Sequence, residues 1–242
     1  MSGAAPMRVL ANATDLIELL AGEGALPLVD VATRIGVPRP SIYRLCEGLA
    51  AVGMVELLPD SRVRLSTRWL ALADAARAGM SEWRGVPEVL AHLVERTGQT
   101  AFLSVPYGSS ALCLDWCQGR GIDVLAYRPG RTIPLHVGAA GRTFAAYGVP
   151  LPEGDLRRLT EKTITDPDEL AADRERIRRD GYALSEEDVT VGIGALGVPI
   201  LAPDGTLRGA LSLGGLVEDV RKHCDDFVAE LRAGVERLLV VP

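Results

Sequence analysis

The sequence is poor in cysteine and in aromatic residues, and it contains no long hydrophobic run. Its four cysteines are too few and too irregularly spaced for a disulfide framework, so we expect reduced thiols. No run approaches the ~18–20 apolar residues of a membrane helix, and no charged-then-apolar leader opens the sequence. These absences argue against a disulfide-stabilised secreted scaffold and an integral membrane protein. We expect a cytoplasmic protein with no membrane partner.

Motifs of common enzyme chemistry are also missing. The sequence has no glycine-rich phosphate loop, no serine-centred elbow and no paired-histidine metal motif. Its three histidines, His92, His136 and His223, lie far apart. Because 48% of the 242 residues are apolar, the chain can still form a sizeable core. We therefore expect a folded protein that is not an enzyme and that needs no cofactor.

The net charge of −6 is unevenly distributed along the chain. Residues 1–80 hold 8 arginines and 8 acidic residues, so the remainder carries the whole negative excess. Within the neutral part, residues 31–46 and 61–68 each hold three arginines and no acid. Such a distribution predicts one basic face that binds DNA weakly per copy, so we expect two copies on a two-fold site.

Residues 28–52 predict a helix-turn-helix. Residues 28–35 have helical apolar spacing, and Gly36 and Pro38 end that helix. A second helix starts near Pro40, with apolar residues at helical spacing: Ile42, Leu45, Leu49 and Val52. The second helix of this motif offers its N-terminal residues to a DNA groove. We expect these side chains to contact base edges or nearby phosphates: Arg39, Ser41, Tyr43 and Arg44.

The segment that follows predicts a wing. Residues 55–58 and 62–65 alternate in polarity around the turn at residues 59–61, which indicates a two-stranded hairpin. Arg62 and Arg64 would lie where a phosphate backbone passes. Together with an earlier helix over residues 8–22, which completes a three-helix core, this pattern indicates a winged helix-turn-helix that binds double-stranded DNA. A winged helix used for protein contact is the alternative.

The rest of the chain predicts a linker helix and an α+β domain. An alanine-rich helix over residues 67–78 ends at Gly79. Beyond it, a helix at residues 83–97 precedes four strands, two helices, two more strands and a final helix. The strands are expected at residues 101–105, 110–116, 122–127, 132–136, 195–201 and 206–213. We place the domain boundaries at 1–66, 67–80 and 81–242, with one central antiparallel sheet in the last domain.

Several separated motifs resemble one known family. The segments are residues 135–142, 177–187, 195–200, 204–205 and 210–215, in that order. They resemble the effector domain of IclR-type bacterial transcription regulators. The resemblance implies a mixed α/β two-domain fold, with a winged helix-turn-helix joined by a linker helix to a GAF-like effector domain. It also implies dimers, or dimers of dimers, that bind palindromic operators as repressors or activators and respond to a small molecule.

The same resemblance implies an effector pocket. Carried over by position, the pocket would be lined by Gly138, Ala139, Gly141, Ser185, Ala195, Ser212 and Gly214. The chain departs from relatives that bind small keto acids, because an acid, a cysteine and a serine are usual at the positions of Ser185, Ala195 and Gly214. Fewer polar groups would therefore converge on the pocket.

Four of the eleven aromatic residues lie on elements that flank this pocket: Phe102, Trp116, Tyr127 and Phe144. They would form either a wall of the pocket or the core of the sheet. If these residues form a wall of the pocket, the effector is a medium-sized, apolar or aromatic organic acid, and this is our hypothesis. Its binding would change the separation of two winged heads through the helix at residues 67–79.

A thiol-dependent enzyme and a metal sensor remain as alternatives. Both would use Cys113 and Cys117 with His136. However, a separation of four residues in a strand places both cysteines on one face, as expected for two small buried apolar side chains. The spacing is also poor geometry for a closed tetrahedral metal site.

Overall fold

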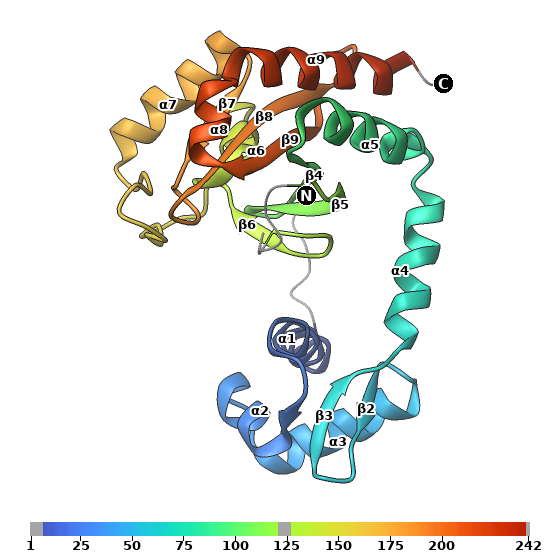
Figure 1. The fold of residues 1–242 in the computed structure, drawn as a ribbon. Coiled ribbons are helices and arrows are strands. Elements are labelled where there is room, and N and C mark those ends of the chain that lie inside the picture. Colours follow the sequence, from blue (N-terminus) through green and yellow to red (C-terminus); the bar gives the residue numbers. More distant parts are fainter. Residues whose placement is uncertain (1–6, 121–126, 241–242) are drawn as a thin grey trace. The chain divides into compact units, whose positions relative to one another are not determined.

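The computed structural model describes residues 7–120 and 127–240 (Figure 1). The chain divides into two compact units, residues 1–81 and 82–242, which we describe separately. No helix within the described residues is long and apolar enough to cross a membrane.

The first unit is a three-helix core with a small sheet. Its elements are α1 (Arg8–Glu23), β1 (Leu26–Pro27), α2 (Leu28–Ile35), α3 (Arg39–Ala51), β2 (Val55–Leu57) and β3 (Arg62–Leu65). The core contains buried aliphatic residues from all three helices and from β2 and β3, among them Leu16, Val31, Ile42, Val55 and Val63. The predicted stop at Gly36 is confirmed, because this residue ends α2 in the left-handed region, at φ 71°.

Three details of this unit differ from the sequence-based expectation. β1 adds a third strand, so the sheet has the order β1-β3-β2 and the wing is more than a hairpin. In α1 the buried residues are Leu16 and Leu20, whereas Val9 and Leu10 of the expected apolar face are more than half exposed. Val52 follows the end of α3 and is also exposed.

The expected linker helix corresponds to α4 (Arg68–Gly79). None of its residues is buried, and Leu70 is 74% exposed. Near its start, Arg68 and Trp69 donate hydrogen bonds to the carbonyl oxygens of Val52 and Met54. The helix is thus anchored at its first turn and otherwise has little packing within its own unit.

The second unit is an α+β domain with a six-stranded antiparallel sheet in the order β6-β5-β4-β9-β8-β7. This arrangement confirms the predicted fold class. The strands are β4 (Thr100–Tyr107), β5 (Ser110–Cys117), β6 (Thr132–Pro134), β7 (Ala183–Glu186), β8 (Ile193–Leu201) and β9 (Leu207–Leu216). The helices are η1 (Ser81–Trp83), at the boundary of the units, and α5 (Val86–Thr97), α6 (Gly138–Ala146), α7 (Pro167–Asp180), α8 (Val217–Lys222) and α9 (Cys224–Val240).

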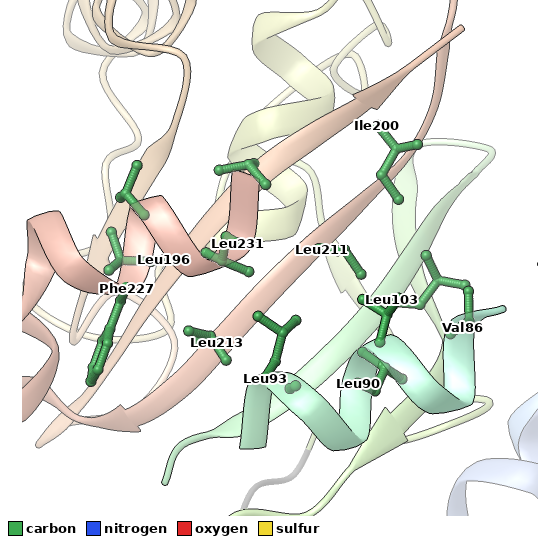
Figure 2. Close-up of a cluster of buried hydrophobic side chains, with 14 of the residues drawn as sticks. Val86, Leu90, Leu93, Leu103, Leu196, Ile200, Leu211, Leu213, Phe227 and Leu231 are labelled. Carbon is green, nitrogen blue, oxygen red and sulfur yellow. The ribbon is translucent and has the colours of Figure 1, made fainter. Parts of the chain in front are cut away.

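Helices cover both faces of this sheet. α5, α8 and α9 pack on one face, and α6 packs on the other with α7 outside it (Figure 1). The main core lies under α5 and α9, where Leu90 and Leu93 meet Leu103, Leu211 and Leu213 of the strands (Figure 2). α7 begins as predicted, because the Asp166 side chain accepts hydrogen bonds from two backbone N–H groups of the first turn.

The remaining differences between the expected and the observed elements concern where helices and strands begin and end. The expected helix at residues 83–97 is divided into η1 and α5, and the last helix is divided into α8 and α9. β6 ends two residues before His136, and the short strand β7 was not predicted as a strand. The expected strand at residues 122–127 lies almost wholly outside the described residues.

Truncation of Leu231 tests the packing of α9 on the sheet. Leu231 is fully buried in the main core. Leu231→Ala should lower the free energy of unfolding of the second unit by about 2–5 kcal/mol, because it leaves a cavity. Urea unfolding measures this loss, and Leu216→Ala serves as the control because Leu216 is half exposed. Equal losses for the two variants would contradict the packing described.

Candidate functional site

The N-terminal half of α3 presents the expected DNA-contact residues. Ile42 and Cys46 point into the core, so Arg39, Tyr43 and Arg44 are exposed and Ser41 is half-buried. Pro38 precedes the helix and Pro40 lies in its first turn. The start of α3 therefore has an exposed surface that combines two positive charges with two hydroxyl groups.

The arginines of this unit differ in whether they are already paired. Arg64 donates from Nε and Nη2 to Glu56 Oε2 at 2.8 and 2.6 Å, and Arg62 Nη2 donates to the Ala25 carbonyl oxygen at 2.8 Å. Within the described residues, Arg39 and Arg44 have no acidic or hydrogen-bonding partner. Among the expected DNA-contact arginines, Arg39 and Arg44 on α3 are thus unpaired, Arg64 on the wing is neutralised by Glu56, and Arg62 has part of its guanidinium engaged, with Nη1 3.8 Å from Asp60.

Sequence analysis did not predict the pairing of Arg64 with Glu56. Glu56 lies on β2, directly opposite Arg64 on β3 in the antiparallel register. The hydrogen bond from Arg64 lowers the pKa of Glu56. Cross-strand pairs of this kind depend on register, which the spacing of residues alone does not specify.

The second unit contains a cavity of about 80 Å³ between the sheet, the start of α6 and the segment that joins β7 to β8. Most of the expected pocket residues line it: Phe102, Tyr127, Gly138, Ala139, Ser185, Ala195, Ser212 and Gly214. Sequence reasoning missed an apolar group of lining residues that includes Ile133, Val189 and Ile193, together with Thr190 and Gly194. These residues lie in β6, in the segment between β7 and β8 and at the start of β8, for which no motif signalled a pocket role.

Two expected pocket residues lie elsewhere. The Trp116 ring lies 6.1 Å from the Phe102 ring but does not line the cavity. Gly141 faces the backbone of β6, where a Cβ atom would come within 2.5 Å of the Pro134 carbonyl oxygen. Phe144 is fully buried in a hydrophobic cluster beside the sheet, so it belongs to the core and not to the wall of the pocket.

One wall of the cavity is aromatic. The rings of Phe102 and Tyr127 lie 5.6 Å apart. The Tyr127 hydroxyl forms a hydrogen bond with Ser104 Oγ at 2.8 Å, and burial raises the pKa of Tyr127. Because this hydroxyl is already paired, the wall presents mainly the apolar ring faces to a ligand.

The start of α6 brings backbone donors to the cavity. Gly138 donates its N–H to Asp188 Oδ2 at 3.1 Å. The N–H groups of Ala139 and Ala140 belong to the first helical turn and have no acceptor within the described residues. Both residues line the cavity, so a ligand oxygen has two candidate donors at the positive end of a helix.

A buried ionic cluster fixes this wall of the cavity. Arg142 of α6 donates from Nε and Nη2 to the two carboxylate oxygens of Asp173 at 2.8 and 2.6 Å. Its Nη1 donates to Asp188 at 3.3 Å and to the Leu184 carbonyl oxygen at 2.8 Å. All three charged side chains are at most 7% exposed. The cluster therefore ties α6 to α7 and to the β7–β8 segment.

This cluster was not found from the sequence. The usable signal was Arg142 itself, a charged residue within a helix of small residues. Its partners lie 31 and 46 residues further along the chain, so no local spacing connects them. Thr160 and Thr163 also bind the β7–β8 segment, through the carbonyl oxygens of Glu187 and Asp188.

Known proteins with similar sequences identify the family. The family model "Bacterial transcriptional regulator IclR C-terminal" matches residues 85–239, and "IclR helix-turn-helix domain" matches residues 9–59. The chain belongs to the IclR family. Its members are DNA-binding transcriptional regulators rather than enzymes, and this chain is such a regulator.

Individual relatives agree with this assignment. The regulator is 31% identical to the HTH-type transcriptional regulator BhcR of Paracoccus denitrificans, covering 86% of this chain and 77% of the relative. Its fold matches an IclR transcriptional regulator from Alicyclobacillus acidocaldarius with a TM-score of 0.82, 23% identity and coverage of 97% and 98%. It also matches an IclR homologue from Microbacterium hydrocarbonoxydans, solved with 4-hydroxybenzoate, with a TM-score of 0.81, 21% identity and coverage of 96% and 97%.

Cys113 and Cys117 do not form the paired thiol or metal site considered from the sequence. β5 has a bulge at Leu114, because Ser104 and Leu103 of β4 pair with Cys113 and Asp115. The extra residue reverses the alternation of the strand, so Cys113 and Cys117 lie on opposite faces. This corrects the expectation that they share a face. Burial also raises the pKa of the Cys113 thiol to about 12, which disfavours a reactive thiolate.

Removal of the Arg142 guanidinium tests the ionic cluster. Arg142→Met should lower the free energy of unfolding by about 3–5 kcal/mol, because Asp173 and Asp188 would remain buried without their main counter-ion. Arg221→Met is the control, since Arg221 is half exposed and its ion pairs with Glu186 and Glu218 should contribute less than about 1 kcal/mol. Chemical denaturation at pH 7 compares the two variants, and similar losses would contradict a special role for Arg142.

The same cluster predicts a dependence of stability on pH. Burial alone would raise the pKa of Asp173, but hydrogen bonds and charge from Arg142 and Arg176 lower it overall. A carboxyl group whose pKa is lowered on folding stabilises the protein above its unfolded pKa of about 3.9, and this stabilisation is lost as pH falls through the lowered value. In Asp173→Asn the loss of stability below about pH 4 should be shallower than in the wild type, as measured by urea unfolding from pH 6 to 3. An unchanged slope would contradict this assignment.

Proposed function

We propose that this regulator binds a palindromic operator as a homodimer and that a small organic acid in the cavity modulates that binding. The observation that carries the proposal is the combination of an unpaired cationic surface on α3 with a largely apolar cavity in the second unit. The regulator would act where chromosomal DNA is accessible, in the cytoplasm.

The lining of the cavity supports an acid with a small apolar body. Two aromatic ring faces and several aliphatic side chains would surround the apolar part of the ligand. The N–H groups of Ala139 and Ala140 would bind its carboxylate. The cavity of about 80 Å³ is smaller than the ~150 Å³ cavity that holds benzene. A few-carbon acid fits this volume, whereas an aromatic acid such as 4-hydroxybenzoate, seen in one structural neighbour, would extend beyond it through the open side of the cavity.

Exposed apolar residues support a dimer. α4 has 12 residues, buries none of them, and exposes Leu70 and Leu72. Helices of this length are marginal alone in water and gain stability from packing. A second copy of the chain that covers α4 would supply this packing and would place two winged heads on a two-fold operator.

In this proposal the effector acts by population shift. The protein would exchange between two arrangements of its winged heads, and the acid would bind one of them more tightly. The change in operator affinity can be no larger than this difference in effector affinity. α4 is the covalent connection through which the change would pass.

A binding titration tests the proposal. Purified protein is titrated against DNA upstream of its own and neighbouring genes by fluorescence anisotropy at two salt concentrations, with and without candidate organic acids. Salt-dependent, sequence-selective binding that an acid changes would support it. Selective binding that no organic acid changes would contradict the effector part, and the absence of selective binding would contradict the operator part.

Substitution of two arginines tests the assignment on α3. Arg44→Ala should weaken operator binding by about 1–3 kcal/mol, because Arg44 has no partner within the described residues and is free to contact DNA. Arg64→Ala should have a smaller effect, because Glu56 already pairs with that guanidinium. Anisotropy with the selected operator compares the two, and a larger loss for Arg64→Ala would reverse the assignment.

A further inference from the structure

The end of α3 leaves three consecutive backbone carbonyl groups without a partner in the helix. Gly53 has φ 73° and donates its N–H to the Ala50 carbonyl oxygen at 2.9 Å. The N–H of Met54 donates to the Leu49 carbonyl oxygen at 2.8 Å, and these two bonds are the usual closure of a helix at a glycine. The carbonyl groups of residues 52–54 lie beyond this closure and need donors from water or from another element.

The segment that leads into α4 supplies donors to all three carbonyl oxygens. Arg68 Nη1 donates to the first, and the Ser66 hydroxyl donates to the second. Trp69 Nε1 donates to the third at 2.7 Å, and the Ser66 N–H donates to the same oxygen at 3.2 Å. The guanidinium also brings a positive charge to the negative end of α3. We call Ser66, Arg68 and Trp69 the clamp.

The clamp also lies at the base of the wing. Val55 of β2 pairs with Leu65 of β3, and the hydrogen bond from Ser66 to Met54 continues this ladder by one step. The end of α3, the open end of the hairpin and the start of α4 therefore meet at one junction (Figure 1). Both elements that carry the expected DNA-contact residues are joined there to α4.

The connection into α4 has little conformational freedom. Only Ser66 and Thr67 lie between β3 and α4, neither is a glycine, and Thr67 already has helical angles of φ −65° and ψ −14°. Arg68 Cδ and Nη1 lie 3.5 Å from the position that a Cβ atom of Gly53 would take, so this side chain packs against the end of α3. α4 itself has no buried residue. Within its unit, the direction of α4 is thus fixed by the clamp and not by packing along its length.

We infer that Ser66, Arg68 and Trp69 are positioning residues for DNA binding: they join α4 rigidly to α3 and to the wing, so that the direction of α4 sets the separation and orientation of two winged heads. This inference rests on the proposed binding of a homodimer to a two-fold operator. A displacement of α4 then moves each head as one body, with α3 and the wing together. Loss of the clamp leaves the DNA-contact residues of each head in place but lets the heads turn independently.

A rigid junction makes the regulator sensitive to the spacing of the two half-sites. One inserted base pair moves the half-sites apart by about 3.4 Å and turns them by about 35° relative to each other. Two rigidly held heads then cannot both engage unless the protein or the DNA is deformed. Flexibly held heads tolerate a range of spacings, but they bind the best spacing less tightly.

Fluorescence anisotropy with three duplexes tests the inference: the selected operator, the same operator with one base pair inserted between its half-sites, and a single half-site. The wild type should bind the lengthened operator at least about tenfold more weakly than the selected one. In the double variant Arg68→Met/Trp69→Phe this ratio should fall below about threefold, and each single variant should give an intermediate ratio. All three variants should bind the single half-site as the wild type does, whereas a general loss of structure would weaken binding to every duplex.

Arg77→Met is the matched control. Arg77 is an exposed arginine of the same helix, and its side chain has no partner within the described residues. This variant loses the same charge as Arg68→Met and should keep the wild-type ratio. An unchanged ratio in both single variants, an equal change in Arg77→Met, or a wild type that tolerates the inserted base pair would overturn the inference.

The proposed function fails separately. If the wild type binds the single half-site as tightly as the selected operator, two-fold binding is contradicted and the role of the clamp falls with it. If the wild type prefers the selected spacing and both single variants keep that preference, two-fold binding stands and only the role of the clamp is overturned.

Discussion

The second unit depends on the buried pairing of Arg142 with Asp173 and Asp188. This cluster holds α6, α7 and the β7–β8 segment together, and these elements form one side of the cavity. A buried ion pair contributes little net stability compared with apolar packing, but loss of one partner is costly. The arrangement therefore fixes where α6 begins and where its free N–H groups point. The same cluster determines the electrostatics of the cavity, because Asp188 occupies the Gly138 N–H and the hydroxyl hydrogen of Ser185.

Local signals in the sequence predicted much of the fold. Gly36 ends α2, Asp166 caps α7 and the apolar spacing places α3, because each signal acts within one or two helical turns. The failures involve contacts that local spacing does not encode. The bulge at Leu114 reversed the expected faces of two cysteines, and the strand register paired Arg64 with Glu56. Most residues of the pocket motifs line the cavity, and their role there stays a prediction. Val189, Ile193 and the partners of Arg142 were missed because only tertiary contacts bring them together.

The two units divide the work of an IclR-family regulator. In the first, the core side of α3 is aliphatic, and its exposed start carries Arg39 and Arg44, which have no acidic partner among the described residues. The phosphate and base contacts proposed for these arginines would not compete with internal ion pairs. In the second, the cavity is largely apolar and has few polar groups, of which the hydroxyls of Ser185 and Tyr127 are already hydrogen-bonded.

The central claim is that occupation of the cavity and operator binding are coupled. Thermodynamic linkage requires the coupling to be reciprocal, so an acid that changes operator affinity by some factor must have its own affinity changed by the same factor when operator is bound. The most direct measurement is calorimetric titration of an organic acid that changes operator affinity into the protein alone and into its operator complex. The account predicts two affinities whose ratio equals the change in operator affinity caused by the acid. Equal affinities in the two titrations would contradict it.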